Sequence, residues 1–155
     1  MTEKNNKVRN AREVFELAQS MFLEKKDLNS YADLFASDGA LELPFSPHKS
    51  KRFIQGRENI RAYLAEVAKA SFTSLRPTGF KSMTIYETID PEVIIAEWDM
   101  RGEVEVTRQP FQLRYLQIFK VHNGEIVTLR DYWNPLGTSE ILGRLPELFA
   151  RLTQK

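Results

Sequence analysis

The predominant spacing of apolar residues differs between the two halves of the chain. Up to about residue 70 they recur mostly every three or four positions, which is typical of amphipathic helices. From about residue 80 they alternate with polar residues, which predicts β-strands. The first helix is expected over Val8–Lys25 and a third over Arg57–Ala70. A last helix is expected over 138–155, starting at Thr138 or Ser139 and interrupted by Pro146.

Between the first and third helices the pattern predicts one short helix and two short strands. The short helix has a single apolar face made of Leu28, Tyr31, Ala32 and Phe35, and the turn-forming pair Asp38–Gly39 is expected to end it. Ala40–Phe45 alternates and predicts a strand with Leu41, Leu43 and Phe45 on one side. Phe53–Gln55 is expected to pair with it and to end at Gly56.

Four longer strands are expected in the second half, with turn signals between them. The strands are Phe80–Ile89, Val93–Val106, Phe111–Val121 and Glu125–Trp133, and the turns are Asp90–Pro91, Thr107–Pro110 and Asn123–Gly124.

This order of elements predicts an α+β fold. Helices come first and an antiparallel meander follows, so the helices are expected on one face of a curved sheet, with a pocket between the two layers. The chain has 155 residues, which favours one domain over 1–155, with residues 1–7 flexible.

One strand is apolar on both faces. In Phe111–Val121, Leu116 and Ile118 share the face opposite to Leu113, Tyr115 and Phe119. A sheet with one wet face alternates cleanly, so the second face is expected to be covered, either by a helix of the same chain or by a partner subunit. Symmetric homodimers are the commonest oligomers, and we therefore expect a homodimer through this outer face.

Composition and charge exclude several classes of function. The net charge is +1, which gives no electrostatic basis for binding nucleic acid or an anionic membrane. The chain has no cysteine and two histidines, so no metal and no thiol chemistry are expected. No glycine-rich nucleotide motif is present, and no cofactor is expected. The N-terminal segment does not resemble a signal peptide and no apolar run could span a membrane, so a cytoplasmic protein is expected.

Two segments resemble the NTF2-like superfamily. They are YADLFASDGALELPF with IQGRENIRAYL in the front half, and FQLRYLQIFKVHNGEIVTLRDYWNPL in the back half. AEWDMRG and the pattern that ends at Asn134 are similar to SnoaL-like proteins and, more narrowly, to the PhzA/PhzB type of phenazine biosynthesis. The resemblance covers residues 8–145 and implies a cone-shaped, cystatin-like α+β barrel. Its members include isomerases, cyclases, dehydratases and carriers, so the fold alone does not settle function.

Strand alternation groups the candidate site residues. Leu129, Asp131 and Trp133 share one face of the last strand, and resemblance to ketosteroid isomerase implies that this face lines the cavity. The same alignment turns residues of other elements inward. They are Ala96, Trp98, Met100, Leu113, Tyr115, Gln117 and Phe119 on strands, Leu41, Leu43, Tyr63 and Val67 from the front half, and Gln19 or Phe22 from the first helix.

Asp131 is the acidic side chain expected inside this aromatic and aliphatic wall. Burial disfavours its charged form and is expected to raise its pKa, which suits a proton shuttle. In the phenazine type the matching position is acidic and is the proposed proton donor. The alternatives stay open: Asp131 can be an ordinary buried acid with a structural partner, and Trp98, Trp133 and Tyr115 can be core residues.

Departures from the relatives limit the expected reaction. Leu43 stands where ketosteroid isomerase has its aspartate base, and Tyr115 stands at that family's second acid, so steroid isomerisation is not expected. Tyr63 replaces a histidine of the phenazine proteins. The candidate function is a cofactor-free isomerase, cyclase or dehydratase acting on a cyclic or polyketide-like molecule. Asp131 would be catalytic in it, and the ligand would contact Tyr115, Trp133, Trp98, Gln117, Tyr63, Leu43, Leu129 and Met100. A non-catalytic carrier of a small apolar ligand, or an interaction module, is the alternative.

Overall fold

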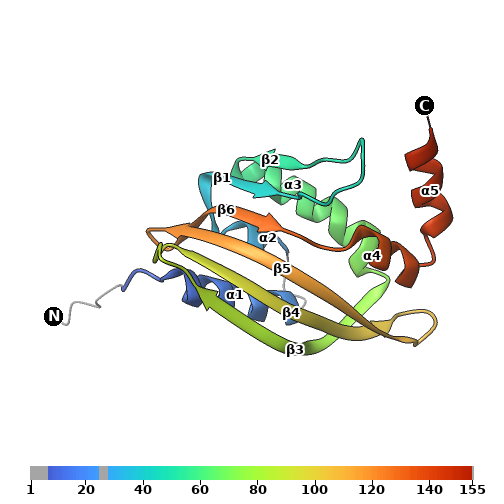
Figure 1. Cartoon of the computed structure of the whole chain (residues 1–155), viewed down its shortest axis with the longest axis horizontal. Helices are drawn as coiled ribbons and strands as arrows, with labels where there is room; N and C mark the ends of the chain where they lie inside the picture. Colours follow the sequence, from blue (N-terminus) through green and yellow to red (C-terminus); the bar gives the residue numbers. More distant parts are fainter. Residues whose placement is uncertain (1–6, 25–27, 155) are drawn as a thin grey trace.

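The computed structural model describes residues 7–24 and 28–154, which form a curved sheet covered by helices on one face (Figure 1). The predicted α+β fold is confirmed. The elements are α1 (Ala11–Leu23), α2 (Leu28–Ala32), β1 (Phe35–Glu42), β2 (Phe53–Gln55), α3 (Arg57–Val67) with a π-helical extension η1 (Ala68–Phe72), β3 (Leu75–Glu87), β4 (Val93–Val104), β5 (Pro110–His122), β6 (Glu125–Asp131), α4 (Pro135–Ile141) and α5 (Leu145–Thr153). Residues 1–6 of the segment expected to be flexible lie outside the described residues.

The sheet has six strands in the order β2-β1-β6-β5-β4-β3. The expected antiparallel meander is present as β3 to β6. β1 joins it by pairing in parallel with β6, which places Leu41 beside Leu129. The front and back halves of the chain therefore share one sheet, and the wall of the molecule is continuous across them.

The first helix begins at a capping box that explains its start. The side chain of Asn10 accepts a hydrogen bond from the Glu13 amide, and the Glu13 carboxylate accepts one from the Asn10 amide, both at 2.9 Å. The predicted apolar face of α1 packs on the concave side of the sheet, where Phe15 meets Phe119 edge-on at 5.4 Å. This helix closes one end of the space beneath the sheet.

The prediction for Phe35 to Gly39 was wrong. α2 ends at Ala32, and Phe35 begins β1 instead of completing a helix face. Asp38–Gly39 lies inside β1, where the register with β6 shifts. A Cβ on Gly39 would lie 2.7 Å from the Ile126 carbonyl oxygen, so the glycine permits a close approach between strands instead of a turn.

Several strand boundaries also differ from the prediction, and β6 ends at Asp131 instead of Trp133. β3 begins at Leu75 instead of Phe80, because it is the edge strand and tolerates Pro77 where the register shifts. β1 ends at Glu42, and Phe45 is 60% exposed instead of facing the interior with Leu43. Its ring contacts Tyr132 edge-on at 5.3 Å. The predicted β2 strand and the break at Pro146 are confirmed.

The C-terminal helices begin earlier than expected. The side chain of Asn134 accepts a hydrogen bond from the Gly137 amide at 3.0 Å and caps α4, so the predicted caps at Thr138 and Ser139 were wrong. Pro135 occupies the first turn, where a missing amide proton costs nothing. This start places Thr138 at the edge of the space between sheet and helices.

Candidate functional site

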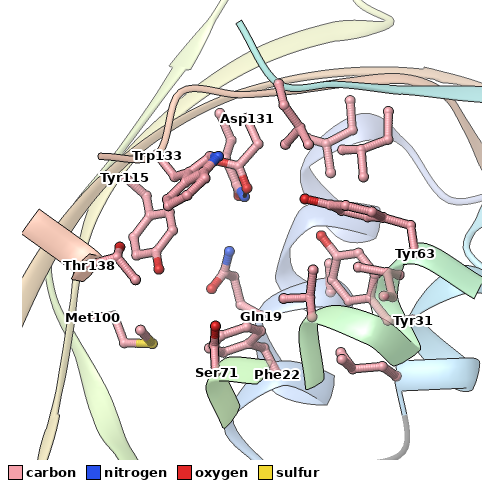
Figure 2. Close-up of a pocket in the computed structure, with 18 of the residues that line it drawn as sticks. Gln19, Phe22, Tyr31, Tyr63, Ser71, Met100, Tyr115, Asp131, Trp133 and Thr138 are labelled. Carbon is pink, nitrogen blue, oxygen red and sulfur yellow. Dashed lines mark hydrogen bonds between the residues drawn. The ribbon is translucent and has the colours of Figure 1, made fainter. Parts of the chain in front are cut away.

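A cavity of about 210 Å³ lies between the concave face of the sheet and helices α1, α2 and α3 (Figure 2). All nine residues expected to act on or contact the ligand line it. The nine are Asp131, Tyr115, Trp133, Trp98, Gln117, Tyr63, Leu43, Leu129 and Met100. Strand alternation brings the sheet residues to one face, and the helical covering places Tyr63 opposite them. Their roles toward a ligand stay predictions.

Asp131 is the last residue of β6 and lies directly opposite Gln117 of β5. The Gln117 side-chain amide donates a hydrogen bond of 3.1 Å to Asp131 Oδ2. The other carboxyl oxygen, Oδ1, is buried and has no hydrogen-bond partner among the described residues. An ionised carboxylate with an unpartnered buried oxygen is unfavourable, so this arrangement favours a protonated acid.

Burial therefore controls the acidity of Asp131. Loss of water raises its pKa to about 7, and the hydrogen bond from Gln117 offsets part of that effect because it stabilises the charged form. No lysine, arginine or histidine belongs to the cavity wall within the described chain. Near neutral pH both protonation states of Asp131 are populated, which is the condition for a group that both takes and returns a proton.

The aromatic wall on the sheet side is a stacked pair. Trp98 and Tyr115 lie face to face, with ring centroids 4.5 Å apart and planes within 9° of each other. Trp98 is 2% exposed, and Phe22 and Phe80 pack edge-on against it. Trp98 is therefore mainly core packing that holds Tyr115 in place, and Tyr115 presents more of its surface to the cavity.

Some residues expected on the wall lie in the core instead. Ala96, Leu113 and Phe119 point to the concave side, as predicted, but they are buried and do not line the cavity. Phe119 is covered by Phe15 of α1. Alternation identifies the face of a strand, but it does not show which part of that face a helix covers.

Several residues of the cavity wall were not predicted from the sequence, or were predicted only as alternatives. Gln19 and Phe22, expected as alternatives, both line the cavity. Tyr31 was expected only on the apolar face of a short helix, and Ser71 and Thr138 had no predicted place in the site. The place of Tyr31 in the cavity wall could not be predicted, because it depends on how α2 packs against α3 and no local sequence pattern encodes that contact.

Unpaired polar atoms concentrate at this cavity. In the described part of the chain, the buried side-chain polar atoms without a hydrogen-bond partner are Gln19 Oε1, Trp98 Nε1, Gln117 Oε1 and Asp131 Oδ1. All four residues belong to the cavity wall. Buried polar groups are usually paired, and a cluster of exceptions at one place is typical of a functional site.

A family model for the SnoaL-like domain matches residues 14–129. The chain belongs to the SnoaL-like family. An uncharacterized PhzA/B-like protein of Pseudomonas aeruginosa is 33% identical, over 94% of this chain and 98% of its own length.

Solved structures of other proteins agree with the fold. A candidate isomerase from Bacillus subtilis is 30% identical, with a TM-score of 0.75 over 86% of this chain and 93% of its own. A candidate polyketide cyclase from Pseudomonas putida is similar in fold, with 17% identity and a TM-score of 0.65 over 86% and 98% of the two chains.

Neither a metal-binding cluster nor a membrane-spanning helix is found in the described part of the chain. Among residues 7–24 and 28–154, no group of three or more histidine, aspartate and glutamate side chains is placed to hold a metal ion. None of the helices described is long and apolar enough to cross a bilayer.

Proposed function

We propose that this SnoaL-like protein is a cofactor-free enzyme of the isomerase or cyclase type that uses Asp131 as general acid and base on a small cyclic molecule. The single observation that carries the proposal is the isolated carboxyl at the end of β6, with a pKa of about 7 in a largely apolar cavity. Perturbed carboxyls in clefts are typical of catalytic sites. Relatives named as a candidate isomerase and a candidate polyketide cyclase support the reaction class.

The proposed chemistry is proton transfer next to a carbonyl group. Ionised Asp131 takes a proton from the carbon beside the carbonyl, and the electron pair of that C–H bond moves toward the carbonyl oxygen. Protonated Asp131 then returns the proton to another atom of the same molecule, so no external reactant is needed. Gln117 holds the carboxyl through its 3.1 Å hydrogen bond, and Tyr115 and Trp133 form the wall against which a flat ring lies.

Deuterium exchange tests this assignment without knowledge of the natural substrate. The probe is β-tetralone, a bicyclic ketone with exchangeable protons beside its carbonyl, followed by NMR in deuterated buffer. The protein is expected to accelerate exchange, and Asp131→Asn is expected to abolish the acceleration without lowering stability. Asp38→Asn, an exposed acid on β1, is the matched control and keeps the wild-type rate. Undiminished exchange in Asp131→Asn would contradict the proposal.

One observation favours a second candidate, a non-catalytic carrier. Among the described residues that line the cavity, Asp131 has no second group that exchanges protons near neutrality, because burial and the Asp131 charge raise the pKa values of Tyr31, Tyr63 and Tyr115. A carrier would retain a small apolar ligand through purification and return it unchanged. Native mass spectrometry of the protein from its own host distinguishes the two, since an enzyme would show conversion of the retained compound.

We further propose a cytoplasmic homodimer formed through the outer face of the sheet. Leu116 and Ile118 lie there, half-buried, and Ile118 is directly opposite Ile95. Charged residues of both signs lie beside this apolar centre. The Arg114 side chain donates a hydrogen bond of 2.5 Å to Glu97 and another to Asp99. A face that carries an apolar centre together with both charges is complementary to a rotated copy of itself, which suits two-fold symmetry.

A further inference from the structure

Three tyrosine hydroxyls remain available at the cavity. Tyr31, Tyr63 and Tyr115 line it, and no hydrogen bond joins their hydroxyls to a described residue. Tyr31 comes from α2 and Tyr63 from α3, two helices that pack against each other. Figure 2 shows the oxygens of Tyr31 and Tyr63 directed into the cavity, away from the helices that carry them. A hydroxyl in such a place lacks a partner until a ligand supplies one.

The two helical hydroxyls face the wall that holds the acid. Asp131 is on the sheet side of the cavity, and Tyr31 and Tyr63 are on the helical side. Gln117 of β5 is hydrogen-bonded to Asp131 and so lies on the sheet side too. Burial first, and then the charge of Asp131, raise the pKa values of both tyrosines. Both phenols therefore keep their protons at neutral pH and can act as hydrogen-bond donors throughout the range in which Asp131 titrates.

The charge of the wall excludes one class of ligand. No basic side chain described belongs to the wall, so a carboxylate or phosphate inside the cavity would have no counter-charge. Lys51 lies near the ring of Tyr63, 5.9 Å from its centroid, but it is an exposed residue that pairs with Glu66 and does not line the cavity. A neutral ligand is the better match for these walls.

The size of the cavity limits the ligand further. An apolar protein cavity of about 150 Å³ holds benzene. The cavity here, about 210 Å³, is larger than that but too small for a four-ring compound. One or two fused rings fit the volume and match the flat Trp98–Tyr115 stack.

We propose that the Tyr31 and Tyr63 hydroxyls are the hydrogen-bond donors for the carbonyl oxygen of a neutral, one- or two-ring ketone whose carbon beside the carbonyl faces Asp131. This inference rests on the proposed function, because it names the substrate class and the oxygen-binding groups of the same site. Two donors on one oxygen orient the ring and stabilise the negative charge that develops there as a proton leaves the neighbouring carbon.

Binding of three compounds with the same ring skeleton tests the proposal. β-Tetralone carries a neutral carbonyl, tetralin carries no oxygen, and β-aminotetralin carries an ammonium group at neutral pH. Their dissociation constants are measured by calorimetry with the wild-type protein. Two net hydrogen bonds predict that β-tetralone binds about tenfold tighter than tetralin. Equal affinities, no binding of either compound, or tighter binding of β-aminotetralin would each overturn the proposal.

Variants assign this preference to the two hydroxyls. The double variant Tyr31→Phe/Tyr63→Phe is expected to remove most of the preference for β-tetralone, while its affinity for tetralin stays within about twofold, since only the oxygens are lost. Tyr86→Phe, at a half-exposed tyrosine of β3 outside the cavity, is the matched control and keeps the full preference. A double variant that still prefers β-tetralone as strongly as the wild type would contradict the assignment.

The same measurement separates this inference from the catalytic one. Asp131→Asn is expected to keep the preference for β-tetralone even though it loses proton exchange, because the carbonyl is bound on the other side of the cavity. Normal exchange in Asp131→Asn would contradict only the catalytic role of Asp131. Loss of the preference in this variant would contradict the placement of the carbonyl at Tyr31 and Tyr63.

Discussion

Gln117 and Asp131 are cross-strand neighbours whose side chains meet inside the cavity, with the amide nitrogen of Gln117 3.1 Å from Asp131 Oδ2. Both are placed by the pairing of β5 with β6, so the distance is set by a rigid sheet and not by a loop. The hydrogen bond stabilises the ionised carboxyl, while burial stabilises the protonated one. The balance between these two effects places the pKa near neutrality.

Replacing Gln117 is expected to shift the pH dependence of proton exchange. Gln117→Met keeps the volume but removes the donor, so the pKa of Asp131 rises above about 7. The rising limb of the pH–rate profile for β-tetralone exchange is expected to move to higher pH by about half a unit to one unit. Gln109→Met, in the exposed turn after β4, is the control. An unchanged profile would mean that the hydrogen bond does not set the acidity.

Ionised Asp131 is expected to lower the free energy of unfolding at high pH. Its folded pKa is raised from an unfolded value near 4 to about 7, so the folded state holds the proton more tightly. The acid therefore favours folding at low pH, and this benefit is lost as pH rises from about 4 through about 7. At pH 8 the free energy of unfolding of Asp131→Asn, measured by denaturant titration, should exceed that of the wild type by at most about 4 kcal/mol. The two free energies should converge near pH 4. A variant less stable than wild type at pH 8 would contradict this.

Placing a charge on the outer sheet face is expected to produce a monomer. Ile118→Glu puts a carboxylate at the centre of the proposed dimer interface, where it would lose water without gaining a partner. Light scattering coupled to gel filtration should report half the wild-type mass. Val106→Glu, in the fully exposed turn between β4 and β5, introduces the same group away from that face and should leave the mass unchanged. A wild-type protein that is already monomeric would contradict the proposed interface.

Two glycines of the β3–β4 pair are expected to respond differently to alanine. A Cβ on Gly102 would lie 2.7 Å from Phe111 Cζ and would also clash with the Arg76 carbonyl oxygen, whereas a Cβ on Gly79 meets nothing within 4 Å. Gly102→Ala is expected to lower the free energy of unfolding by about 1–3 kcal/mol, and Gly79→Ala to leave it nearly unchanged. Chemical denaturation of both variants checks the contrast, and equal effects would rule out the steric explanation.

Alternation along β4, β5 and β6 was enough to place the sheet side of the site. It is a local property of the backbone, so the inward face could be predicted once one residue on it was known. The Asn123–Gly124 dipeptide was enough to predict a turn, and both residues have positive φ. The helical side was harder, because Tyr31 reaches the cavity only through the packing of α2 on α3.

The errors have a common physical cause, which is contact between segments distant in sequence. Asp38–Gly39 is a turn-forming pair in sequence, but Gly39 lies within a strand and allows the Ile126 backbone to approach closely. Pro77 is unfavourable in a central strand but is tolerated because β3 lies at the edge of the sheet. In both cases the residue's role depends on strand order, which local spacing does not contain.

The parallel pairing of β1 with β6 has a consequence for how the protein folds. It joins Leu41 to Leu129, so the cavity wall needs segments from near both ends of the chain, and such long-range contacts are slow to form. The β3–β4–β5 meander is built from neighbouring segments and is expected to assemble first. We therefore expect a refolding chain to acquire its sheet before its binding site. Ligand binding should appear as a late phase in refolding experiments, after most of the β-structure has formed.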